Sequence, residues 1–199
     1  LLIVTMLYTL FSHVMHQEYK YMAQNSLVSA DSVLLNSYDK LSGVINEVLS
    51  LNNLSVFFLR DEADRANEAN IFLELRRLKN LYPYIEKISL INLSGNRYLG
   101  TDGASDQVDD SIVEHYEQSG AGGLVSFRRT IPEKIRLTNS PCTEVTTFVF
   151  FPSGQYRDSA IVLDLKDSYF IDLLNPAALQ PLDQILLVTN GSGLIGRTD

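Results

Sequence analysis

Few residues of the types that usually carry catalysis or bind metals occur in this chain, and none forms a familiar set. Its three histidines do not accompany Asp, Glu or Cys at the spacing of a metal site or a catalytic set. His13 and His16 lie three residues apart and could share a metal ion on a helix, but an ordinary position on a helix surface explains them better. His115 falls in the acidic segment 109–118, which we expect to be an exposed helix. We therefore predict no metal site and no catalytic histidine.

Other short motifs give no catalytic set either. The serine-glycine pairs at 153–154 and 192–193 lack the strand-to-helix context of a nucleophile elbow. The glycines of 93–103 lack the spacing and the following helix of a phosphate-binding loop. The single cysteine, Cys142, excludes an internal disulfide and is more readily an incidental thiol than a reactive one. We predict that this chain has no enzymatic activity and no cofactor.

Several residues are suited to binding a small molecule. They lie on or beside segments rich in β-branched and aromatic residues, which are typical of strands. Arg128 carries a planar guanidinium that can clamp a carboxylate, and Asp164 could accept hydrogen bonds from an ammonium group or from sugar hydroxyls. For either residue, the alternative is a position at a sheet edge or on the surface. Small-molecule sites combine an apolar concave surface with a few convergent polar groups. The candidate ligand-binding residues are therefore Tyr98, Asp102, Phe127, Arg128, Thr147 and Asp164.

These candidates need an antiparallel sheet to hold them, and the sequence predicts one. Short β-branched and aromatic segments are separated by turns rich in proline, glycine and asparagine. The expected strands are 85–92, 97–101, 123–131, 144–151 and 159–165, and the expected helices beside them are 63–81, 109–120 and 166–174. Helices gathered early in the chain beside an antiparallel sheet indicate an α+β fold.

A long helix is expected before the sheet. From 25 to 51 the chain lacks proline, and its apolar residues recur at steps of three, four and seven: Leu27, Leu34, Tyr38, Leu41, Ile45 and Val48. Continued back through Met22 and Met15, this stripe predicts one helix. The stripe can pack against the chain's own sheet or pair with the same helix of a second chain, and the sequence favours neither.

The composition and the first residues bear on partners and location. A formal net charge of −8 disfavours binding to nucleic acid or to an anionic membrane surface. Residues 1–11 carry no charge and are mostly apolar, over about half of the roughly 20 residues that span a bilayer. Aromatic residues lie near the change to polar sequence, so we interpret 1–11 as the end of a transmembrane helix. The alternatives are a buried helix end and, less well supported because no small-residue cleavage site follows, a cleaved signal peptide. We expect the chain to be part of a longer protein.

An internal repeat is the most specific feature of the sequence. Residues 85–102, IEKISLINLSGNRYLGTD, align without gaps with residues 182–199, LDQILLVTNGSGLIGRTD. Both begin with an apolar residue and an acid, share Ile-x-Leu, turn through Ser and Gly, and end on Thr-Asp. Similar hairpins also arise by chance. A second copy so far along the chain nevertheless fits a second module that begins where the first is complete.

With this repeat and the long leading helix, the chain resembles the double Cache domains of bacterial sensors. In that family a helix leaving the membrane runs along two stacked PAS-like lobes. The resemblance covers nearly all of the chain, and its motifs are patterns of hydrophobicity and turns. It implies a membrane-emerging helix over 12–52, a membrane-distal PAS-like lobe over 53–180, and the first hairpin of a membrane-proximal lobe over 181–199. Similar sensors of Gram-positive bacteria belong to AraC-type transcription regulators or to histidine kinases.

The resemblance also implies a function. We expect an extracytoplasmic domain, anchored in the cell membrane, that binds an unidentified small molecule and forms a homodimer through its N-terminal helix. Double Cache domains that bind amino acids or amines carry an Arg-x-Trp-Tyr motif, and this chain has no tryptophan, which argues against such a ligand. The alternative is a structural or protein-binding ectodomain of the same fold, with a pocket filled by its own side chains. A soluble enzyme would need a polar cluster in space that the sequence does not reveal.

Overall fold

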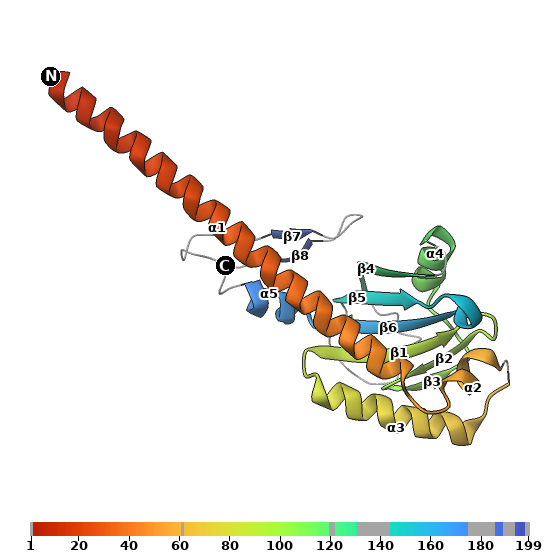
Figure 1. Ribbon diagram of the computed structural model, residues 1–199. Helices are drawn as coiled ribbons and strands as arrows, with labels where there is room; N and C mark the ends of the chain where they lie inside the picture. Colours follow the sequence, from red (N-terminus) through yellow and green to blue (C-terminus); the bar gives the residue numbers. More distant parts are fainter. Residues whose placement is uncertain are drawn as a thin grey trace.

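One long helix carries a lobe of sheet and helices near its C-terminal end. The structure is a computed structural model that describes residues 2–60, 62–119, 122–130, 144–174, 186–188 and 194–197. Helix α1 (Leu2–Leu49) projects far beyond the lobe, and its C-terminal part crosses the sheet (Figure 1). This arrangement confirms the predicted long helix that precedes an antiparallel sheet.

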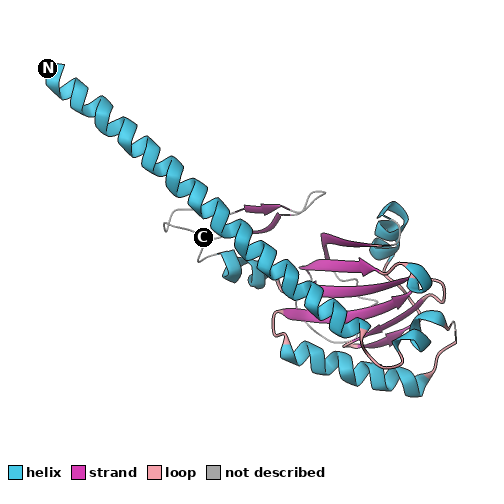
Figure 2. Ribbon diagram, viewed as in Figure 1, coloured by secondary structure: helices cyan, strands magenta, loops and turns pink. Residues whose placement is uncertain are grey.

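The lobe is built on a six-stranded antiparallel sheet. Its strands are β1 (Ile85–Asn92), β2 (Arg97–Gly100), β3 (Gly103–Ser105), β4 (Gly123–Thr130), β5 (Glu144–Phe151) and β6 (Ser159–Leu165). They lie in the order β3-β2-β1-β6-β5-β4, so the early hairpin is joined to the later strands through β1 and β6. The predicted α+β fold is therefore confirmed, and Figure 2 shows the helices gathered around this sheet.

Three helices cover one face of the sheet and form the main core with it. They are the end of α1, α2 (Leu54–Leu59) and α3 (Arg65–Leu81). Helix α3 begins at Asp64, whose carboxylate accepts a hydrogen bond from the Asn67 N–H (3.1 Å), as an N-cap does. Val44 of α1 and Leu75 of α3 are completely buried, and each such side chain contributes about 1.5–3 kcal/mol.

Helix α4 (Asp110–Ser119) covers part of the opposite face, which we call the α4 face. There Ile112 of α4 packs in a second apolar cluster with residues of the inner strands, among them Ile91, Phe151 and Val162. Side chains along a strand alternate between faces. A bulge between Ile85 and Lys87 shifts this alternation, so Ile85 joins the helix-side core while Lys87 points to the α4 face.

The C-terminal strands form a sheet of their own. In the described part of the chain, β7 (Leu186–Val188) pairs only with β8 (Leu194–Arg197), and helix α5 (Asp167–Leu174) contacts β8. A separate hairpin is what the predicted start of a second lobe requires. The predicted boundary between lobes, at 180–181, falls outside the described residues and stays a prediction.

The predicted apolar stripe of α1 is buried in one part and exposed in the other. Leu41, Ile45 and Val48 are buried in the lobe, whereas Leu27 and Tyr38 are 71% and 47% exposed. The stripe therefore packs on the chain's own sheet only near the end of the helix. Along the described residues, no helix is long and apolar enough to cross a bilayer.

Candidate functional site

A buried hydrogen-bonded network centred on Arg129 lies on the α4 face. Arg129 Nε donates to the Thr147 hydroxyl (2.9 Å), Nη2 donates to both carboxylate oxygens of Asp164 (3.1 Å each), and Nη1 donates to Asp109. The Thr147 hydroxyl in turn donates to Asp164 Oδ1 (2.6 Å). The side chains of Arg129, Asp109 and Asp164 are 8%, 7% and 0% exposed. In so little water, charge-assisted hydrogen bonds are strong and an unpaired charge is costly.

The register of the sheet explains why these residues meet. Asp164 on β6 is paired with Lys87 on β1 and with Thr147 on β5, and Thr147 is paired with Phe127 on β4. One row of side chains therefore runs across four strands on the α4 face. Arg129 follows Phe127 by two residues, so it lies on the same face and reaches Thr147 and Asp164.

The carboxylates around Arg129 keep it charged. Burial alone lowers the pKa of the Arg129 guanidinium, but the negative charges of Asp164 and Asp109 outweigh burial and leave this pKa raised. Arg129 is therefore a fixed cation whose planar group is oriented by partners on two sides.

A second polar group surrounds Tyr98 on the same face. Lys87 Nζ lies 2.7 Å from Asp102 Oδ2 and 4.8 Å from the centroid of the Tyr98 ring. The Tyr98 hydroxyl donates to Asp102 Oδ1 (2.8 Å) and is hydrogen-bonded to the Ser89 hydroxyl (2.9 Å). Burial raises the pKa of Tyr98 well above its ordinary value, and the charge of Asp102 adds to the effect. Tyr98 therefore remains a neutral hydrogen-bond donor.

Gly100 leaves the space in which this second group forms. It is paired with Ser89 across β1 and β2, and a Cβ atom at Gly100 would overlap the Tyr98 hydroxyl. The same Cβ would lie 2.6 Å from Asp102 Oδ1. A side chain at this position and the hydrogen bond from Tyr98 to Asp102 therefore exclude one another.

The structure brings most of the predicted candidates together. Tyr98 and Asp102 belong to the group around Lys87, and Thr147 and Asp164 belong to the network around Arg129. Phe127 lies on the same face and is 8% exposed. Whether these residues bind a ligand stays a prediction.

Arg128 is the predicted candidate that does not lie with the others. Arg128 is paired with Thr146, and it alternates with Phe127 and Arg129, so it lies on the other face of β4. Phe127 and Arg128 therefore do not share a face, because neighbouring residues of a strand point in opposite directions. Counting two residues on from Phe127 identifies Arg129 from the sequence, and Lys87 likewise lies two residues before Ser89, on the same face of β1.

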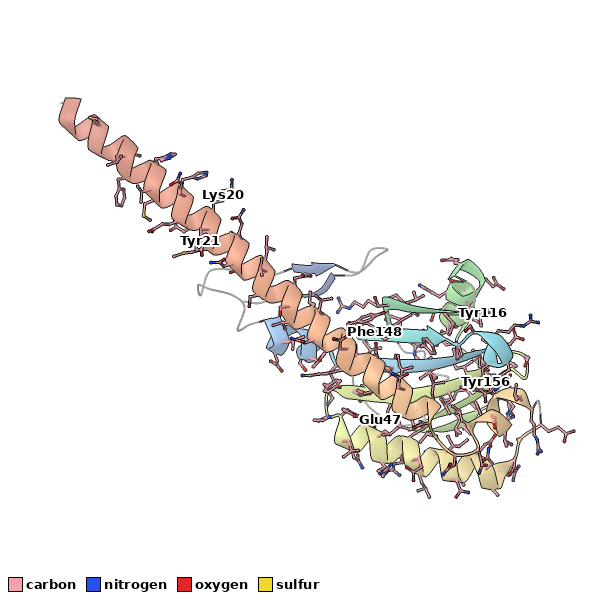
Figure 3. The ribbon with its side chains drawn as sticks, in the orientation of Figure 1. Lys20, Tyr21, Glu47, Tyr116, Phe148 and Tyr156 are labelled. Carbon is pink, nitrogen blue, oxygen red and sulfur yellow. The ribbon has the colours of Figure 1, made fainter. Side chains whose placement is uncertain are left out.

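His115 is half-buried, on the side of α4 that faces the sheet. Its ring stacks on Phe127 with the centroids 3.8 Å apart, and its Nδ1 lies 2.8 Å from the Ser111 carbonyl oxygen. One turn along, Tyr116 donates to Asp158 (2.9 Å) and packs on Phe151. Figure 3 labels Tyr116 on α4. Both aromatic side chains thus attach α4 to the sheet.

Three other features bear on binding: possible metal ligands, Cys142 and a surface groove. Among the described side chains, no group of three or more His, Cys, Asp or Glu residues could hold a metal ion. Cys142 lies outside the described residues. An open groove of about 700 Å³ between the end of α1 and α3 is bordered by the ion pair of Arg77 and Glu74, whose side chains are 66% and 47% exposed. A solvent-exposed ion pair is a weak interaction. The charged groups of the α4 face are buried, so we take the α4 face as the candidate site.

Comparison with known proteins identifies the fold and not a family. No known protein family matches the chain by sequence, and no curated protein is similar to it. Among solved structures, it is similar to a domain of a protein assigned to the sensory box/GGDEF family from Vibrio parahaemolyticus. The two share 13% identity with a TM-score of 0.56, over 76% of this chain and 61% of the other.

A second similar structure is the extracellular domain of a protein assigned as a histidine kinase. Its TM-score is 0.51 at 14% identity, over 77% of this chain and 62% of that one. This chain therefore spans about three fifths of the length of either structure. At such low identity the likeness establishes the fold alone, which is a long helix followed by a PAS-like antiparallel sheet.

Proposed function

We propose that this chain is a sensory ectodomain of a signal-transduction protein, and that its α4 face binds an external small molecule. The observation that carries the proposal is the buried set of polar groups around Arg129 and Tyr98, beside an apolar and aromatic surface. Such a combination is typical of small-molecule sites. The similar structures support the sensory role, since one belongs to a sensory box protein and the other to a histidine kinase.

A route from this face to the rest of the protein runs through the sheet. Val44 and Val48 of α1 pack on the side of the sheet opposite to the α4 face. The hydroxyls of Ser37 on α1 and Tyr169 on α5 are also hydrogen-bonded (2.8 Å). A ligand that favours one arrangement of the sheet against α1 would bias the helix by its difference in affinity for the two arrangements.

A melting-temperature screen tests the proposal. The wild-type domain is heated with each member of a library of amines, carboxylates, sugars and nucleosides, because ligands that bind the folded state raise the melting temperature. Any compound that does so is tested again on Thr147→Val, which removes one hydroxyl of the α4 face at nearly constant volume. We expect a smaller rise for the variant. A library that never raises the melting temperature would contradict direct sensing.

The location that accompanies this function is extracytoplasmic, with α1 leading from the cell membrane. Large apolar residues at the start of α1 are exposed by 63% to 72%: Met6, Tyr8, Leu10 and Phe11. Exposed apolar surface of this kind favours contact with lipid or with another protein. An AraC-type regulator or a histidine kinase would supply the output of the whole protein.

A homodimer through α1 completes the proposal. Val14, Tyr21, Val28 and Leu35 follow one another at steps of seven and are 46%, 66%, 70% and 59% exposed. Residues at such a spacing occupy the same position in successive heptads, as one of the two apolar positions of a parallel coiled coil does. Figure 3 shows Tyr21, with Lys20, on the part of α1 that projects from the lobe.

One observation favours the alternative of a protein-binding ectodomain without a small-molecule ligand. Lys87 and Arg129 already pair with carboxylates on the α4 face, as in a pocket filled by its own side chains. The two functions differ in the melting screen, because a closed face would give no rise with any compound of the library.

A further inference from the structure

Asp109 differs from the other partners of Arg129 in its place in the fold. Thr147 and Asp164 lie on β5 and β6, in the middle of the sheet, and Asp164 is completely buried. Asp109 lies in the segment before α4 and is attached to the sheet through its ion pair with Arg129. Of the partners described for Arg129, it is the one that can leave without breaking a strand.

Asp109 also caps helix α4. Its Oδ1 accepts hydrogen bonds from the backbone N–H (3.0 Å) and the hydroxyl (2.8 Å) of Ser111, while its Oδ2 accepts from Arg129. The backbone N–H of Ile112 donates to the Asp109 carbonyl oxygen (3.0 Å). One carboxylate therefore holds the first turn of α4 together and fixes that turn to the sheet.

The remaining contacts of α4 are of another kind. Tyr116 donates a hydrogen bond to Asp158 near the other end of the helix, His115 stacks on Phe127, and Ile112 packs on the apolar part of the sheet. Without its ion pair, the N-terminal end of α4 would be held chiefly by apolar packing. The helix could then move about its attachment at Tyr116.

We propose that Asp109 is an internal ligand of Arg129, which holds α4 closed over the sheet until the carboxylate of an external ligand takes its place. This inference rests on the proposed ligand-binding function of the α4 face. Thr147 and Asp164 occupy the Nε and Nη2 edges of the guanidinium, so Nη1 is the edge on which carboxylates exchange. Asp109 occupies the position of the ligand's acid group, and its displacement couples binding to movement of α4.

Acetate serves as the probe, because it carries the carboxylate of Asp109 without its chain. Asp109→Ser keeps a hydroxyl that can cap α4 but removes the acid group from Arg129. We expect acetate to raise the melting temperature of this variant more than chloride does at the same ionic strength, and more than acetate raises that of the wild type. The matched control is Asp110→Ser, at the exposed neighbouring residue, which should respond like the wild type.

Amide hydrogen exchange measures the movement of α4. In Asp109→Ser, the amides of α4 should exchange about tenfold faster or more, while those of β5 and β6 keep the wild-type rate. If the serine variant does not fold, Asp109→Asn replaces it, because the amide keeps the volume of the side chain and one capping oxygen. Unchanged exchange in α4 would overturn the proposal. An acetate response as large in the double variant Asp109→Ser, Arg129→Gln would overturn it too.

The outcome separates this inference from the proposed function. If acetate does not replace Asp109 but another compound raises the melting temperature of the wild type, the internal ligand is wrong and sensing stands. If acetate replaces Asp109 in the variant while no compound of the library acts on the wild type, the exchange on Arg129 is real and direct sensing is wrong.

Discussion

The polar group around Tyr98 requires a glycine at position 100. Because a Cβ at Gly100 would overlap the Tyr98 hydroxyl, Gly100→Ala must push Tyr98 away from Asp102 and Ser89. We expect a loss of about 2 kcal/mol or more in the free energy of unfolding, from overpacking and unpaired polar groups. Urea denaturation measures this loss.

Gly43 provides the control for that substitution. It lies within α1, where an added Cβ meets nothing within 4 Å. Gly43→Ala should therefore stabilise the protein by about 0.5–1 kcal/mol, because alanine loses less conformational freedom in a helix. Equal effects of the two substitutions would contradict the steric account of Gly100.

Tyr84 contributes to the alkaline limit of the domain's stability, as Tyr98 also does. Burial raises its pKa to about 12, with smaller contributions from Tyr169, Tyr82 and Glu47. In the unfolded chain a tyrosine ionises near its ordinary pKa of 10.0, so the neutral Tyr84 contributes its full stability below that pH. This contribution is lost as the pH rises from about 10 to 12.

The Tyr84→Phe variant tests this limit, since phenylalanine keeps the ring that stacks on Tyr169 at 4.5 Å. Between pH 10 and 12, the free energy of unfolding should fall less steeply for the variant than for the wild type. Parallel curves for the two proteins would show that Tyr84 does not set the limit.

At the level of secondary-structure elements, we predict that two copies of α1 pair. Val28→Glu places a charge in the exposed stripe of Val14, Tyr21, Val28 and Leu35, and in a parallel pair of helices the two charges would face one another. Light scattering of the protein as it leaves a size-exclusion column should show the wild type as a dimer and the variant as a monomer. Ala23→Glu, at an exposed position on another side of α1, should remain a dimer. A wild-type monomer at every concentration would contradict pairing through α1.

The main elements follow from the sequence because their signals are local. Alternation and β-branched residues predict the strands, and the observed β1 and β5 have the predicted bounds of 85–92 and 144–151. The short elements α2 and β3 escape prediction. Helix α2 is six residues of mostly apolar sequence without a full period, and β3 is three residues that pair only because β2 lies beside them.

The candidate site was only partly predictable, because only some of its residues have a local signal in the sequence. Tyr98, Asp102, Thr147 and Asp164 follow from placing polar residues on strands, and they do converge. Asp109, by contrast, reaches Arg129 only through the way α4 packs on the sheet. Such long-range placements leave no local pattern in the sequence.

At the scale of the whole molecule, the two faces of the sheet serve different purposes. One face is filled by apolar side chains of α1, α2 and α3, which tie the sheet to the projecting helix. The α4 face instead combines a smaller apolar cluster with buried charges. This asymmetry suits the proposed sensor, which needs a site that can respond and a packed connection to the helix that leaves the lobe.

Hydrogen exchange of the wild-type domain with the strongest compound from the melting screen tests the central claim most directly. The account predicts a change of exchange in α4 and in the ends of β2 and β4 that carry Tyr98 and Arg129, with a smaller change along the C-terminal part of α1. A change confined to the groove between α1 and α3, with the α4 face unaltered, would contradict it.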